Sequence, residues 1–411
     1  MLSYFSKKNY FFTFIIFIFG ILISRIVSYG DDLDFLGLIH TFINVIENGT
    51  YTPSRFYGSP LAEFLIGLFA YFFGGEISAF ICYVLFVFSL NFLFCYFYNN
   101  ENKSLTNYKF YFYALCLTNP VLLFDNVNPS DFAISLFFFS FGLFILKTKY
   151  KLFSSILFGF AIASRANYAA FVIIILILEF LFNKKNNTLK DSILIFLNTI
   201  IIMSLFYLPI TILHKLKIDY ISNPGGPEFK LAELFPRFFY KFYLLFGVYN
   251  SLLFVCLFLI GFIGLNQKNI KKFVIDEKNL IGLVLINTLI FFFVPTKTAI
   301  ISMVIILFYI LLIKNFGKKI LLSIVFFNVL YWVVSYQLFD FKYKYSSLCD
   351  PIIFVDKEFN FKIKEGFFFE KKKQLLGRIK CNSVEFKDED EREKYLRGEK
   401  LFGSKSILTV R

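Results

Sequence analysis

Long apolar runs, separated by short polar segments, recur along almost the whole chain of 411 residues. A helix needs roughly 20 apolar residues to cross the ~30 Å hydrocarbon core of a bilayer. Hydrophobic residues make up 57% of the chain and charged residues 18%, whereas soluble domains average about 45–50% and about 25%. The pattern therefore predicts an all-α polytopic membrane protein and excludes a soluble globular protein.

Hydropathy predicts about eleven transmembrane helices, and two of the runs need interpretation. The first resembles a signal peptide, but its length and the lack of a small-x-small cleavage site favour a retained span. The run over 152–164 is too short to cross upright, so we expect two tilted helices broken near Arg165. The expected spans are 10–28, 77–98, 108–124, 132–146, 152–164, 166–182, 192–210, 242–265, 280–294, 299–313 and 320–338.

The loops between the expected spans differ in their content of basic residues. Alternate loops hold 17 Lys and Arg on the side of the N-terminus and 9 on the other side before residue 340. Since cytoplasmic loops carry the excess of basic residues, the N-terminus is predicted to be cytoplasmic. The membrane domain then covers 1–339, with a first outer loop at 30–76 and a second long outer loop at 211–241.

Residues 340–411 leave the apolar pattern and hold 17 basic and 13 acidic residues. Strand-like stretches at Ile352–Val355 and Phe359–Ile363 predict a small α+β or β-rich soluble domain, which eleven spans place in the periplasm. An oxidising compartment allows a disulfide between Cys349 and Cys381, and the sequence leaves this pairing open. The abundant Phe, Ile, Lys, Asn and Tyr indicate A/T-rich codons and favour a bacterial inner membrane.

Three aspartates in four residues, Asp31, Asp32 and Asp34, stand at the end of the first expected span. Carboxylates crowded at a low-dielectric boundary raise one another's pKa, which suits one of them to accept a proton near neutrality. The alternative is that a span end simply needs solvated polar residues. The spacing of Asp32 and Asp34 also suits a divalent metal, but it is common by chance, and we assign no metal or other cofactor.

The same outer loop continues with an irregular segment that holds Arg55 and Glu63 between turn-forming prolines and a glycine. The apolar stretch Leu61–Phe73 is only 13 residues long, so we expect a helix that lies along the outer surface. A short span is the alternative, and it would invert every later loop.

Isolated cations mark three later positions on the outer side. Arg165 stands at the expected helix break, Arg237 lies among aromatic residues in the second long outer loop, and Lys297 lies in a short turn. For Arg237 an interfacial anchor is the alternative to binding a lipid phosphate, and for Lys297 the alternative is a snorkelling side chain. The basic residues punctuate apolar spans and form no stripe, which argues against nucleic acid as a partner.

The order of these elements resembles the GT-C superfamily of integral-membrane glycosyltransferases, over roughly residues 10–315. The resemblance rests on Asp31-Asp32 at the span end, SRFYGSPLAEFL (54–65), Asn119-Pro120, Asn128-Pro-Ser-Asp131, Arg165 at a break, and Pro295-Thr-Lys297. The chain departs from the family at Thr298-Ala299, where many relatives have an aromatic residue or Arg-Tyr. The tail after residue 340 resembles no family domain.

The resemblance implies transfer of a sugar from a polyprenyl-phosphate donor to a glycan, lipid or protein acceptor at the outer leaflet. It implies that Asp31 is the general base, with Asp32 as its neighbour or as the base itself. The implied phosphate-binding residues are Arg55, Arg165, Arg237 and Lys297, and the implied positioning residues are Asp34 and Glu63.

Two other functions fit the chain less well. A transporter or flippase of a lipid-linked saccharide predicts charged residues at mid-span and internal repetition, and the sequence shows neither. A non-catalytic scaffold would leave the three aspartates and Arg55 of the first outer loop without a role.

Overall fold

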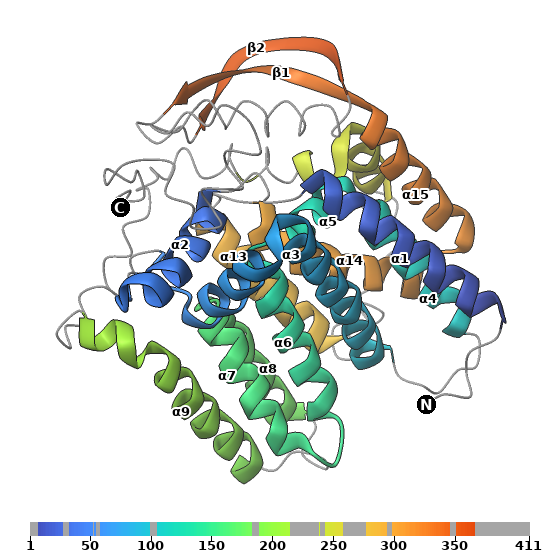
Figure 1. The fold of residues 1–411 in the computed structure, drawn as a ribbon. Helices are drawn as coiled ribbons and strands as arrows, with labels where there is room; N and C mark the ends of the chain where they lie inside the picture. Colours follow the sequence, from blue (N-terminus) through green and yellow to red (C-terminus); the bar gives the residue numbers. More distant parts are fainter. Residues whose placement is uncertain are drawn as a thin grey trace.

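A computed structural model describes the chain over 7–27, 33–51, 53–54, 58–98, 105–182, 189–213, 238, 243–257, 277–293, 298–345 and 351–365. Apart from one two-stranded hairpin, the described part is helical (Figure 1). The helices in its first half are α1 Lys7–Val27, α2 Leu33–Asn48, α3 Pro60–Phe97, α4 Leu105–Thr118, α5 Pro120–Val127 and α6 Asp131–Leu146. Those that follow are η2 Lys151–Phe153, α7 Ser154–Ser164, α8 Tyr168–Phe182, α9 Leu189–Leu213, Tyr243–Leu257, α13 Lys278–Phe293, η3 Thr298–Ile301, α14 Ser302–Asn315 and α15 Lys318–Val333.

Among the described residues, two helices are long and apolar enough to cross a membrane: α3, and residues Leu189–Ile212 of α9. A third span results if α5 and α6, which meet at a bend of 95°, are counted as one. Shorter apolar helices include most of α1, α7, α8, α13 and α14. The described part of the chain is therefore mainly helical, with two or three helices of membrane-spanning length.

One predicted break and one predicted short helix coincide with observed features. The expected break near Arg165 is confirmed, because α7 ends at Ser164 and α8 begins at Tyr168. The expected helix over Leu61–Phe73 is also present, as the first part of α3. This part ends at Gly74, whose φ of 80° breaks the regular helix before the second part begins.

Two predicted spans have the wrong bounds. The expected span 108–124 is interrupted, since α4 ends at Thr118 and α5 begins at Pro120. Pro120 cannot donate a backbone hydrogen bond, and the Asn119 side chain instead accepts one from the Leu122 N–H at 2.9 Å, which caps α5. The expected span 320–338 ends at Val333, where an extended strand begins.

Amide and hydroxyl groups join the helices around the α4–α5 break. Asn119 Nδ2 donates to Tyr309 Oη of α14 at 2.9 Å and to the Leu245 carbonyl at 2.9 Å. Asn328 of α15 donates to Thr118 Oγ1 at 3.2 Å. Because buried polar groups need partners, these bonds fix which helix ends meet.

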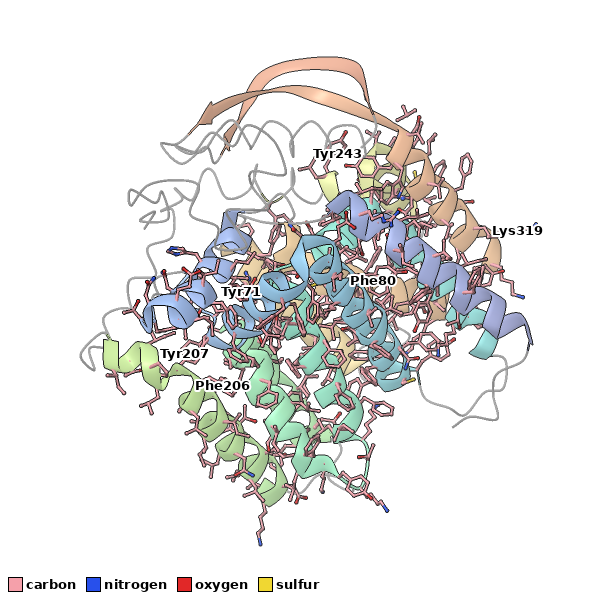
Figure 2. All side chains as sticks on the ribbon, viewed as in Figure 1. Tyr71, Phe80, Phe206, Tyr207, Tyr243 and Lys319 are labelled. Carbon is pink, nitrogen blue, oxygen red and sulfur yellow. The ribbon has the colours of Figure 1, made fainter. Side chains whose placement is uncertain are left out.

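Aromatic rings fill much of the remaining space between helices. Phe92 of α3 stacks on Phe141 of α6 with ring centroids 4.7 Å apart. Phe80 of α3 meets Phe17 of α1 edge-on at 5.5 Å, and the side chains fill the space between these two helices in Figure 2. Stacked and edge-on ring pairs of this kind stabilise contacts between helices.

The hairpin consists of β1 Val334–Tyr345 and β2 Pro351–Glu365, which pair antiparallel with Val334 opposite Glu365 and Tyr345 opposite Pro351. Its register shifts near Phe339. Both stretches that the sequence marks as strand-like lie within β2. Residues 366–411, including Cys381, and also Cys349 lie outside the described residues.

Gly67 of α3 allows α2 to approach closely, because a Cβ at this position would overlap the Phe42 side chain. We expect Gly67→Ala to lower the free energy of unfolding by about 1–3 kcal/mol, since one helix must move away from the other. Chemical denaturation of the purified protein in detergent micelles measures the loss.

Gly317→Ala is the matched control, because no atom lies within 4 Å of a Cβ at that position. We expect it to change stability by less than about 1 kcal/mol. Equal losses in the two variants would contradict the close approach of α2 and α3.

Candidate functional site

Glu63 and Arg165 are the two residues of the predicted site whose side chains the structure describes. Asp34 lies in the first turn of α2, but its side chain is outside the described set. The predicted base residues and the other predicted phosphate-binding residues also lie outside it: Asp31, Asp32, Arg55, Arg237 and Lys297.

Glu63, only 1% exposed, holds the turn that precedes α3. Its Oε2 accepts a hydrogen bond from the Tyr51 hydroxyl at 2.5 Å. Its Oε1 accepts from the Ser54 N–H at 2.9 Å, the Ser54 hydroxyl at 2.5 Å and the Ser59 N–H at 3.0 Å. Four donors to one carboxylate offset much of the free-energy cost of burying its charge.

The local sequence explains why Glu63 meets these donors. Ser59 is the N-cap of α3 and Pro60 its first residue, so Glu63 in the first turn can reach back to the Ser59 N–H. Gly58 has a φ of 64°, which favours glycine, and a Cβ there would overlap Ile210 of α9. The turn is thus folded around the carboxylate and against α9.

Burial raises the pKa of Tyr51 well above its usual range, and the charge and hydrogen bond of Glu63 raise it further. Tyr51 is therefore a neutral donor to Glu63 at any physiological pH. This excludes Tyr51 as a general base and assigns it to holding the carboxylate.

Arg165 forms an ion pair with Asp131 beside this turn. Its Nη1 donates to Asp131 Oδ2 at 2.8 Å, with the Asp131 side chain fully buried and the Arg165 side chain 14% exposed. The guanidinium also lies over the Phe132 ring, 3.6 Å from its centroid. Asp131 begins α6 and Arg165 separates α7 from α8, so the pair joins a helix start to a helix break.

Ser59 connects the turn to the ion pair. Its hydroxyl donates to Asp131 Oδ2 at 3.4 Å, while its N–H donates to Glu63. Glu63, Ser59, Asp131 and Arg165 form a single chain of contacts, here named the outer cluster. It brings two of the predicted site residues, Glu63 and Arg165, to one end of the bundle.

Several buried polar atoms close to the outer cluster in sequence have no hydrogen-bond partner within the described part of the chain. They are Asn126 Oδ1, Ser130 Oγ, Arg165 Nε and Asn167 Oδ1. Buried polar atoms are nearly always paired. A group of unpaired donors and acceptors at helix breaks is therefore a place where a polar ligand or water can bind.

A second polar group, here named the inner cluster, lies at the opposite end of α6 and α8. Glu179 Oε1 accepts from the Tyr96 hydroxyl at 2.7 Å and from Asn279 Nδ2 at 2.6 Å. Lys147, which follows α6, donates to the Tyr96 carbonyl and lies 4.1 Å from the Tyr96 ring centroid. Lys314, in the last turn of α14, forms an ion pair with Glu277, which directly precedes α13; Lys314 Nζ lies 2.6 Å from Glu277 Oε1.

Sequence reasoning missed the partners of both predicted residues. The sequence analysis names Asp131 only as the last residue of the motif Asn128-Pro-Ser-Asp131. It assigns no role to Tyr51, Ser54 or Ser59. Ser59 followed by Pro60 is a recognisable helix start, but Glu63 stands one residue beyond the capping-box position, so its contact with the Ser59 N–H has no standard sequence signal. The pairing of Asp131 with Arg165 spans 34 residues and leaves no local signal.

Within the described ranges, no three His, Cys, Asp or Glu side chains lie close enough together to hold a metal ion. Comparison with known proteins finds no matching family model, no matching curated protein and no matching solved structure. The candidate site is therefore defined by its own geometry.

Glu63→Gln tests the role of the buried carboxylate. An amide of the same shape offers one acceptor oxygen in place of two and turns an NH₂ group toward existing donors. We expect a loss of about 1.5–3 kcal/mol in the free energy of unfolding. Denaturation in micelles measures it, with the exposed Glu47→Gln of α2 as control; a Glu63 variant as stable as this control would rule out the proposed clamp.

Proposed function

We propose that the protein is a membrane glycosyltransferase that moves a sugar from a polyprenyl-phosphate donor to an acceptor glycan, lipid or protein. The observation that carries the proposal is the outer cluster. It places two buried carboxylates and a guanidinium at one end of the helical bundle. A lipid-linked anionic donor needs such groups at headgroup depth, with apolar helix surfaces beside them for its chain.

The proposed chemistry is displacement at the anomeric carbon of the donor sugar. A carboxylate accepts the proton of the acceptor hydroxyl while cations stabilise the departing phosphate. In this proposal Asp31 is the base, with Asp32 beside it or acting in its place. Both residues belong to the connection between α1 and α2.

Two contacts support placing this connection near the outer cluster. Arg25, in the last turn of α1, lies 3.9 Å from Glu76, which follows the Gly74 kink of α3. Leu38 and Ile39 of α2 form a small core with Ile66 and Ala70 of the first part of α3. The end of α1 therefore adjoins α3 just after the Gly74 kink, and α2 adjoins the first part of α3, which Glu63 anchors.

The remaining site roles are proposed on the same basis. Arg55, Arg165, Arg237 and Lys297 bind donor phosphate, and Asp34 and Glu63 position the loop. The outer cluster faces the periplasm, the inner cluster faces the cytoplasm, and about eleven spans place the soluble tail outside. The separation of the two clusters along α6 supports placing them on opposite sides of the membrane, and the excess of basic residues in alternate loops is the basis for the orientation.

A transporter or flippase of a lipid-linked saccharide is the second candidate, and one observation favours it. The α5–α6 bend and the α7–α8 break are discontinuous helices with polar residues at the break, as in many transporters. The two functions differ in their product. An enzyme releases polyprenyl phosphate, whereas a flippase leaves the donor intact.

Cysteine labelling tests the orientation. Single cysteines replace Glu47 of α2 and Lys149 after α6, both exposed, in a background in which the native cysteines are serine. We expect a membrane-impermeant maleimide to label the Glu47→Cys protein in intact spheroplasts and the Lys149→Cys protein only after permeabilisation. Labelling of both from the same side would refute the proposed orientation.

Asp31→Asn and Asp32→Asn test the proposed base. We expect at least one of them to lower the rate of polyprenyl-phosphate release by about 100-fold or more, because proton transfer contributes about 10²–10⁴-fold. The rate is measured with purified protein, a lipid-phosphate sugar and an acceptor extract. Asp191→Asn is the control, since Asp191 pairs with Lys151 away from the outer cluster; wild-type rates in both test variants would refute the assignment.

A further inference from the structure

Two contacts hold the Arg165 guanidinium in one orientation. Asp131 accepts from Nη1, and the Phe132 ring covers one face of the planar group. A guanidinium has five N–H donors in a rigid fork. The donors that Asp131 does not use lie along the edges of that fork, and Nε has no acceptor within the described part of the chain.

A second unpaired donor stands next to Asp131 in the chain. Ser130 is the N-cap of α6 and is 2% exposed, yet its hydroxyl makes no capping bond and has no partner in the described ranges. The N-terminus of a helix as long as α6 favours a negative charge. Two buried donors without acceptors at this position fit an oxyanion of a ligand.

Asp131 does more than neutralise Arg165. The same oxygen, Oδ2, accepts from Arg165 and from the Ser59 hydroxyl. Ser59 in turn belongs to the turn that Glu63 holds through four hydrogen bonds. The orientation of the guanidinium is thereby tied to the position of the first outer loop.

We propose that Asp131 is a positioning residue, which turns Arg165 so that its Nε edge, together with the Ser130 hydroxyl, binds the phosphate of a lipid-linked phosphoester. Ser59 links this phosphate site to the Glu63 turn. The inference takes the lipid character of the ligand from the proposed function, but binding of phosphate can be measured without any sugar transfer.

The test uses the full-length protein in nanodiscs with a constant phosphatidylglycerol content. Polyprenyl phosphate is titrated in, and its affinity is read from the rise in melting temperature. We expect Arg165→Gln and Asp131→Asn each to weaken binding about tenfold or more, as loss of a charge-assisted hydrogen bond implies. Asp131→Glu should recover part of the loss, because it restores the charge.

The double variant separates positioning from a direct contact. If Asp131 acts through Arg165, then Asp131→Asn combined with Arg165→Gln binds no more weakly than Arg165→Gln alone. This comparison remains valid if Asp131→Asn alone fails to fold, because the double variant removes both buried charges. Additive losses, or unchanged affinity in Arg165→Gln, would overturn the proposal.

Ser59→Ala tests the link to the first loop. Ser24→Ala is the control, because the Ser24 hydroxyl donates to the Gly20 carbonyl of its own helix. We expect a severalfold loss of affinity for the first variant and none for the second; equal behaviour would remove Ser59 from the proposal.

Inorganic phosphate is the second probe. Tighter binding of inorganic phosphate than of the lipid, with the same dependence on Arg165, would overturn the lipid assignment.

These outcomes are distinguishable from failure of the proposed function. Loss of lipid-phosphate binding in the Arg165 and Asp131 variants of a protein that transfers no sugar would support the inference and refute the transferase. Sugar transfer with unchanged lipid-phosphate binding in those variants would support the transferase and refute the inference.

Discussion

A carboxylate buried among apolar helices needs hydrogen-bond donors or a cation beside it. This requirement determines which residues meet at one end of the bundle. Glu63 satisfies it with hydrogen bonds from three residues of the preceding turn. Asp131 satisfies it with Arg165 and Ser59. Because the two solutions share Ser59, neither carboxylate can change its surroundings without affecting the other.

The polar contacts at the other end follow the same logic with different residue types. Glu179 accepts hydrogen bonds from the Tyr96 hydroxyl and from Asn279 Nδ2. Lysines at that end bond carbonyl or carboxylate oxygens across helix ends, as Lys147 and Lys314 do. Polar side-chain contacts therefore join the helices at both ends of the bundle, and aromatic rings pack between the helices in the part that separates these ends.

Residue patterns along the chain predict the local features and miss the distant ones. Helix positions and the break at Arg165 follow from apolar run lengths, because hydropathy reports how far a helix can extend. The break at Asn119-Pro120 lies inside a long apolar run, and hydropathy alone therefore predicts an uninterrupted span there. The sequence places Glu63 in an irregular segment, whereas the structure places it in the first turn of α3. Its partners, and the pairing of Asp131 with Arg165, depend on how helices meet, which no single sequence encodes locally.

If α6 crosses the membrane, as the proposed function requires, its length has a consequence for the surrounding lipid. Asp131 and Leu146 bound a helix of 16 residues, which at 1.5 Å per residue extends about 24 Å. Lys147 is the next residue, so charged groups stand at both ends of a helix that is shorter than the ~30 Å apolar thickness of an average bilayer. Hydrophobic mismatch of this sign draws the two leaflets together. Beside α6 the membrane should be locally pinched, which would bring the headgroups down to the depth of Arg165.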